Sequence, residues 1–156
     1  MKKDISKIVL YLLILFLAIT CKNKELKKIE YSFENIEKKI TSIVDSNKKE
    51  IDISKLMPFE WDAMYMFKPY TSIESIDNNL GFIWESPEKT YISQEEYFYA
   101  LVFTKNNKVI SYIKWPINMG DFMRIKNIKF PYDSAKFIFK NEKYGGQDWL
   151  FIYEKK

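Results

Sequence analysis

Apolar residues follow three successive patterns along the chain. Residues 8–19 are twelve uninterrupted apolar residues. Apolar positions then recur at alternating spacings of three and four, which gives a helix one apolar stripe. These positions are Leu26, Ile29, Phe33, Ile36, Ile40 and Ile43. From residue 51 onward, the alternation of apolar and polar residues that is typical of strands predominates. The pattern predicts three parts: a leader over 1–20, an amphipathic helix within 21–50, and a single domain over 51–156.

The predicted helix within 21–50 has two interpretations. It can form a coiled coil with a partner, or it can pack on its own domain. Three heptads are short for an independent coiled coil, and no systematic pattern of opposite charges flanks the stripe. We therefore expect the helix to pack on its own domain.

Residues 59–67 alternate with period two and predict a strand with one aromatic face, which Pro69 ends. Residues 71–74 then match a capping box, in which the Thr71 hydroxyl and the Glu74 carboxylate satisfy helix-terminal amides. We expect a short helix to follow, with Gly81 as its left-handed C-cap. Its predicted buried face consists of Ile73, Ile76 and Leu80.

The remaining residues predict antiparallel strands. We expect a short strand over 81–85 and a hairpin of 97–104 with 109–115, whose Asn106-Asn107 turn tolerates positive φ. Pro116 restricts the second of these strands to a sheet edge or a bulge. The pattern of residues 122–130 is ambiguous.

Residues 135–139 and 149–153 predict a last hairpin, with Gly145-Gly146 in its connection. The chain has no internal repeat and no low-complexity linker. The predicted fold class is α+β: an N-terminal helix, a short capped helix and a mostly antiparallel β-sheet.

The first twenty residues have the arrangement of an export signal. A basic start with Lys2, Lys3 and Lys7 precedes the apolar run, and a polar segment follows Cys21. A membrane-spanning anchor is the alternative. The fourteen residues between Lys7 and Lys22 would span about 21 Å as a helix, whereas a bilayer core needs about 30 Å. The sequence favours a cleaved signal over a permanent span.

Residues 17–21, Leu-Ala-Ile-Thr-Cys, resemble the end of a bacterial lipoprotein signal. In that family the cysteine is lipidated and becomes the mature N-terminus. The resemblance implies that Cys21 is acylated and that the protein is held at the cell membrane or outer membrane, outside the cytoplasm. A buried structural thiol is the alternative for a lone cysteine. Several acyl chains would anchor the protein firmly, because one chain alone binds only marginally.

Composition removes several classes of function. The chain has no histidine and one cysteine, which excludes Ser–His–Asp and Cys–His catalysis, His- or Cys-rich metal sites and internal disulfides. The net charge is only +4, and Arg124 is the one arginine. Because arginine provides the bidentate contacts to guanine and phosphate, a nucleic-acid partner is not expected. No cofactor, metal or catalytic residue is assigned.

Two pairs of acids could still support a carboxylate-dependent hydrolase. Glu60 and Asp62 share one predicted strand face, and Glu95 is next to Glu96. Two close carboxylates would raise the pKa of one of them, as in glycosidases. Acids that alternate with aromatic residues are also typical of the solvent face of an ordinary strand. We favour that second interpretation.

Aromatic residues are the one compositional excess, with 12 Phe, 11 Tyr and 4 Trp. Tyr and Trp provide rigid amphipathic area that interfaces favour. The candidate binding surface consists of Tyr70, Trp84, Trp115 and Asp121. We expect its exposed centre at Trp115, because Pro116 ends the strand there and residues 118–121 form a loop.

Residues 61–71, of pattern WD-x-x-Y-x-F-x-PYT, resemble a segment of small exported bacterial lipoproteins of unknown function. The order of a helix followed by antiparallel strands also resembles envelope modules of the β-lactamase-inhibitor and outer-membrane-assembly type. Those modules place helices on one face of a curved sheet and bind proteins through the other. Taking these observations together, we expect a non-catalytic binding module at the cell envelope, for a protein or an envelope polymer. The alternatives are an immunity factor that neutralises a toxin and the hydrolase above.

Overall fold

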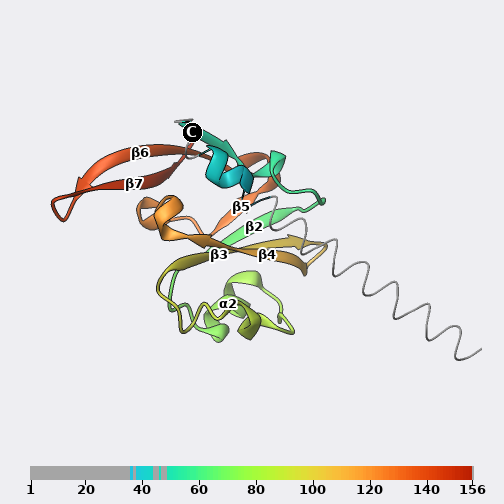
Figure 1. Cartoon of the computed structure of the whole chain (residues 1–156). Helices are drawn as coiled ribbons and strands as arrows, with labels where there is room; N and C mark the ends of the chain where they lie inside the picture. Colours follow the sequence, from blue (N-terminus) through green and yellow to red (C-terminus); the bar gives the residue numbers. More distant parts are fainter. Residues whose placement is uncertain (1–35, 37, 44–45, 47–48, 156) are drawn as a thin grey trace, which may run out of the picture. The chain divides into compact units, whose positions relative to one another are not determined.

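The computed structural model describes residues 36, 38–43, 46 and 49–155 (Figure 1). The predicted signal, Cys21 and most of the predicted N-terminal helix lie outside these residues. The chain divides into two units, Met1–Glu37 and Lys38–Lys156, and the description below concerns the second. Residues 38–43 are helical, and Ile40 among them is buried. None of the described helices has the length and apolar character needed to cross a bilayer.

The described elements form two antiparallel sheets with little helix. The strands are β1 Glu50–Asp52, β2 Ala63–Phe67, β3 Phe98–Lys105, β4 Lys108–Pro116, β5 Lys129–Pro131, β6 Lys136–Tyr144 and β7 Gln147–Glu154. The α-helix with defined ends is α2, Ile73–Leu80, and 3₁₀ turns cover Ile53–Lys55, Pro87–Thr90, Ile117–Met119, Phe122–Arg124 and Tyr132–Ser134.

The strands are distributed between a three-stranded sheet of order β1-β6-β7 and a four-stranded sheet of order β4-β3-β2-β5. Every pairing within them is antiparallel. The predicted antiparallel character is therefore confirmed, although the strands form two sheets rather than one. In Figure 1 the four-stranded sheet lies between α2 on one side and the β6–β7 hairpin on the other.

Both predicted hairpins form. Asn106 and Asn107 turn between β3 and β4 with φ of 50° and 56°, and the Asp62 carboxylate accepts a hydrogen bond from the Asn106 amide at 2.8 Å. β4 is an edge strand that ends at Pro116, as expected. The second hairpin is longer than predicted, because β6 and β7 continue to the Gly145-Gly146 turn.

The capped helix is confirmed with one change. Its N-cap is Ser72, whose hydroxyl accepts from the Ser75 amide, while Thr71 instead donates to the Lys68 carbonyl. Gly81 ends the helix at φ 77°, as predicted. Ile76 and Leu80 are buried but Ile73 is exposed, because Ile73 is the first helical residue and faces solvent.

β2 differs from its prediction. It begins at Ala63, and all five of its residues are buried. Tyr65 and Phe67 pack in one cluster with Ile76 and Leu80 of α2, whereas Met64 and Met66 point to the opposite side of the sheet. The aromatic residues of β2 therefore share one face, as predicted, but the opposite face is buried as well because β2 is an internal strand covered on both sides.

One further expectation is corrected, and one ambiguous segment is assigned. Residues 81–85 form no strand, and the Trp84 amide donates to the Asp77 carboxylate at 3.0 Å instead of to a neighbouring strand. The ambiguous residues 122–130 contain the 3₁₀ turn Phe122–Arg124 and the start of β5.

Edge-to-face aromatic contacts connect the two sheets. Phe122 contacts Tyr99 of β3, Trp115 of β4 and Phe137 of β6, with ring centroids 5.3 to 5.6 Å apart. Phe130 of β5 contacts the same Phe137 at 5.2 Å. This arrangement fixes the position of the β6–β7 hairpin relative to the ends of β3 and β4.

Candidate functional site

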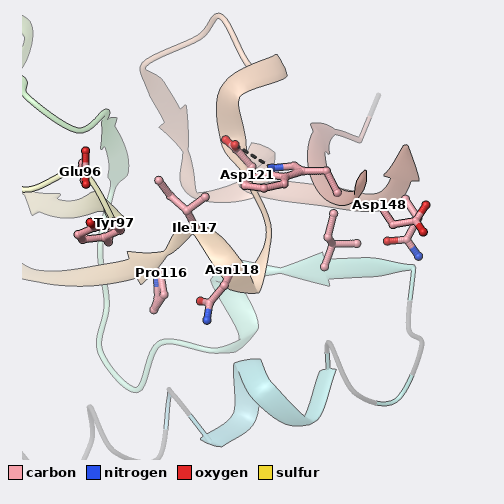
Figure 2. Close-up of a pocket in the computed structure, with 10 residues that line it drawn as sticks. Glu96, Tyr97, Pro116, Ile117, Asn118, Asp121 and Asp148 are labelled. Atoms are coloured by element: carbon pink, nitrogen blue, oxygen red, sulfur yellow. Dashed lines mark hydrogen bonds between the residues drawn. The ribbon is translucent and has the colours of Figure 1, made fainter. Parts of the chain in front are cut away.

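A cavity of about 820 Å³ lies between the start of β3, the end of β4 and the outer half of the β6–β7 hairpin (Figure 2). Such a volume is typical of small-molecule sites, which range over roughly 300–1,000 Å³. The described residues that line it are Glu96, Tyr97, Pro116, Ile117, Asn118, Asp121, Asn141, Asp148, Trp149 and Leu150.

The chain builds one side of the cavity where β3 begins and β4 ends. The Ile117 amide donates to the Tyr97 carbonyl at 2.9 Å, which holds the two segments together after their strand pairing has stopped. The turn that starts at Ile117 ends at Gly120, whose φ of 126° is outside the range that other residues adopt readily. This turn directs the following residue, Asp121, toward β7.

Asp121 joins the two sheets through its side chain. Its side chain is only 6% exposed, and Oδ1 accepts hydrogen bonds from the Tyr99 hydroxyl at 2.6 Å and the Met123 amide at 2.7 Å. Oδ2 accepts a third from the Trp149 indole nitrogen at 3.0 Å, drawn in Figure 2. Burial, reinforced by the Asp121 carboxylate, raises the pKa of Tyr99 far above that of an exposed tyrosine.

The main chain of Asp121 makes the same connection. Its amide donates to the Leu150 carbonyl and its carbonyl accepts from the Ile152 amide, both at 2.8 Å. These bonds form a short parallel bridge to β7 opposite Phe151. The hairpin wall, including the Trp149 ring, is therefore held in place by hydrogen bonds of the chain itself.

One rim of the cavity carries a carboxylate between two tyrosines. The Tyr70 hydroxyl donates to Glu96 at 3.0 Å. The pKa of the Glu96 carboxyl is lowered by the neighbouring Tyr97 hydroxyl and then by that of Tyr70. Tyr70 and Tyr97 are 61% and 70% exposed. The backbone of Tyr70 is left-handed, with φ 63°.

The opposite rim is polar and also carries a paired carboxylate. Asp148 forms a 2.9 Å ion pair with Lys143, and both side chains are exposed. Asn141 lies on β6 opposite Leu150, and the exposed Asn118 comes from the turn after β4. In Figure 2, Glu96 and Tyr97 lie at one end of the labelled residues and Asp148 at the other.

The sequence predicts Trp115 as the exposed centre of the binding surface, and this prediction is wrong. The side chain is 0% exposed. Its indole nitrogen donates to the Gly120 carbonyl at 2.9 Å, and its ring packs on Phe122. The loop that follows β4 folds back over Trp115 instead of leaving it at the surface.

The other three residues of the predicted surface are found in different places. Asp121 lines the cavity and Tyr70 contacts its rim through Glu96. Trp84 is partly buried against Tyr112, with ring centroids 5.7 Å apart, and does not line the cavity. Tyr97 and Trp149 belong to the aromatic residues that the sequence offers for a binding face. Asn118 and Asn141 were not assigned to a site from the sequence, although residues 118–121 were expected to form a loop there.

The acidic pair Glu60 and Asp62 has structural partners. Glu60 forms an ion pair with Lys105, which lowers the pKa of its carboxyl, and Asp62 binds the turn amide of Asn106. Glu96, of the second pair, binds tyrosine hydroxyls. Within the part of the chain that the structure describes, no three His, Cys, Asp or Glu residues are grouped to hold a metal.

The chain matches no known protein family, and neither curated proteins nor solved structures include a significant match to it. The assignment of function therefore depends on the geometry above.

Proposed function

We propose that the protein is an exported lipoprotein, acylated at Cys21, whose folded part is a non-catalytic binding module for a protein or an envelope polymer. The cavity between β4 and the β6–β7 hairpin is the binding site. The membrane is the second partner, through the acyl chains.

The observation that carries this proposal is that hydrogen bonds of the chain itself hold the walls of the cavity. Asp121 holds one wall with three side-chain hydrogen bonds, while the rim leaves two tyrosine rings largely exposed. Preformed walls reduce the ordering cost of binding, and exposed tyrosines provide contact area at low entropic cost. The acids that a hydrolase would need are instead bound to lysine, amide and tyrosine partners.

Cross-linking in intact cells, followed by affinity purification of the full chain, tests the binding role. We expect a specific partner that Tyr97→Ala loses. Tyr91→Ala is the control, because Tyr91 is an exposed tyrosine outside the described lining. Equal capture by the parent protein and Tyr97→Ala would contradict the assignment of this cavity.

Metabolic labelling with a fatty acid tests the anchor. We expect label on the parent protein, none on Cys21→Ser, and loss of that variant from the membrane fraction. An unlabelled parent protein with an intact N-terminus would refute the lipoprotein proposal.

A further inference from the structure

The lining of the cavity combines flat aromatic surface with neutral hydrogen-bonding groups. Tyr97 and Trp149 contribute rings, and Asn118 and Asn141 contribute carboxamides. A carboxamide both donates and accepts hydrogen bonds, so it matches a hydroxyl group in either direction. Because its indole nitrogen binds Asp121, Trp149 is held with its ring as part of the wall.

The charges of the lining disfavour an anionic ligand. The charged groups among the described lining residues are the carboxylates of Glu96, Asp121 and Asp148. Of these, the Asp148 carboxylate is paired with Lys143. A phosphate or carboxylate entering the cavity would meet like charge.

The same carboxylates do not require a cationic ligand either, because each has a partner. Glu96 accepts from Tyr70, and Asp148 is paired with a lysine. Asp121 accepts from three donors. Carboxylates in this state act as fixed hydrogen-bond acceptors, and acceptors next to aromatic rings match a neutral ligand rich in hydroxyl groups.

We propose that the cavity binds an uncharged saccharide chain. The flat C–H face of a sugar ring stacks on Trp149, the hydroxyl groups bond to Asn118 and Asn141, and Tyr97 closes the open end. The volume of about 820 Å³ leaves room for more than one sugar ring. This inference rests on the proposed function, of which it specifies the ligand.

Isothermal titration of the full chain tests the proposal, in a detergent without a sugar headgroup. The probes are chitotetraose, maltotetraose and trilysine. We expect at least one tetrasaccharide to bind and trilysine not to bind. Asn118→Ala combined with Asn141→Ala removes two hydrogen bonds to the ligand, so we expect Kd to rise at least tenfold.

Asn78→Ala is the matched control, because Asn78 is an exposed asparagine on α2 and does not line the cavity. Its Kd should equal that of the parent protein. The saccharide proposal is overturned if neither tetrasaccharide binds, if trilysine binds instead, or if the double variant binds as tightly as Asn78→Ala.

The titration also separates this inference from the proposed function. If cross-linking in cells still depends on Tyr97 while no tetrasaccharide binds, the cavity is a binding site and the saccharide assignment alone is wrong. If neither capture nor titration depends on the cavity, both proposals fail.

Discussion

Replacing Asp121 by alanine tests whether this carboxylate holds the two sheets together. The substitution leaves the buried Tyr99 hydroxyl, the Trp149 indole nitrogen and the Met123 amide without their acceptor. An unsatisfied buried donor costs about 1–3 kcal/mol. Tyr99 is the most enclosed of the three donors and is expected to contribute most.

Two effects reduce the total free-energy cost of Asp121→Ala. The variant no longer buries a charged carboxylate, and the partly exposed Trp149 can bond to water in the cavity. We expect a net loss of about 3 to 4 kcal/mol, a large share of a typical stability of 5–15 kcal/mol.

Urea denaturation of the full chain measures this loss, with Asp148→Ala as the control. Asp148 lies on the same wall, but its ion pair is exposed, so its removal should cost at most about 1 kcal/mol. A lower midpoint with an unchanged slope for Asp121→Ala would agree with the argument. If the two variants lost the same amount, Asp121 would not connect the sheets as described.

Three further predictions concern the same region. Trp115→Ala should lower the free energy of unfolding by about 3–5 kcal/mol. A melting temperature equal to that of the parent protein, together with weakened binding, would contradict the burial of Trp115. Gly120→Ala should also destabilise the protein, because the backbone there has a φ of 126° and an added Cβ would lie 2.7 Å from Ile152 Cδ1. A melting temperature equal to that of the parent protein would show that Ile152 moves aside. The pKa of Tyr99 is raised in the folded protein, so the stability that depends on its neutral hydroxyl is fully present below pH 10, the ordinary pKa of tyrosine. This stability is lost as the pH rises above 10, because Tyr99 then ionises in the unfolded chain first. Tyr99→Phe should therefore lose less stability than the parent protein between pH 9 and 11 in alkaline denaturation, and parallel curves would refute this.

Local signals in the sequence predicted the elements that depend on neighbouring residues. The Asn106-Asn107 turn and the Gly81 cap require positive φ, which these residue types adopt at little cost. For the same reason, the strands on either side of the Asn pair were placed within one or two residues of their observed ends.

Long-range contacts explain the errors. Trp115 is followed by a proline and a polar loop, so its sequence resembles a strand end at the surface, yet it is covered by residues that return over it. The cavity was not predicted because its walls come from segments about fifty residues apart, such as Glu96 and Trp149. Their meeting depends on Asp121, for which the sequence contains no local pattern.

The left-handed backbone of Tyr70 has a consequence for directed evolution. A bulky residue at φ 63° costs about 1–2 kcal/mol that glycine or asparagine would largely avoid. Libraries selected only for heat resistance should therefore replace Tyr70, whereas libraries selected for ligand capture should keep it. Opposite enrichment at this one codon would distinguish a ring kept for recognition from one kept for folding.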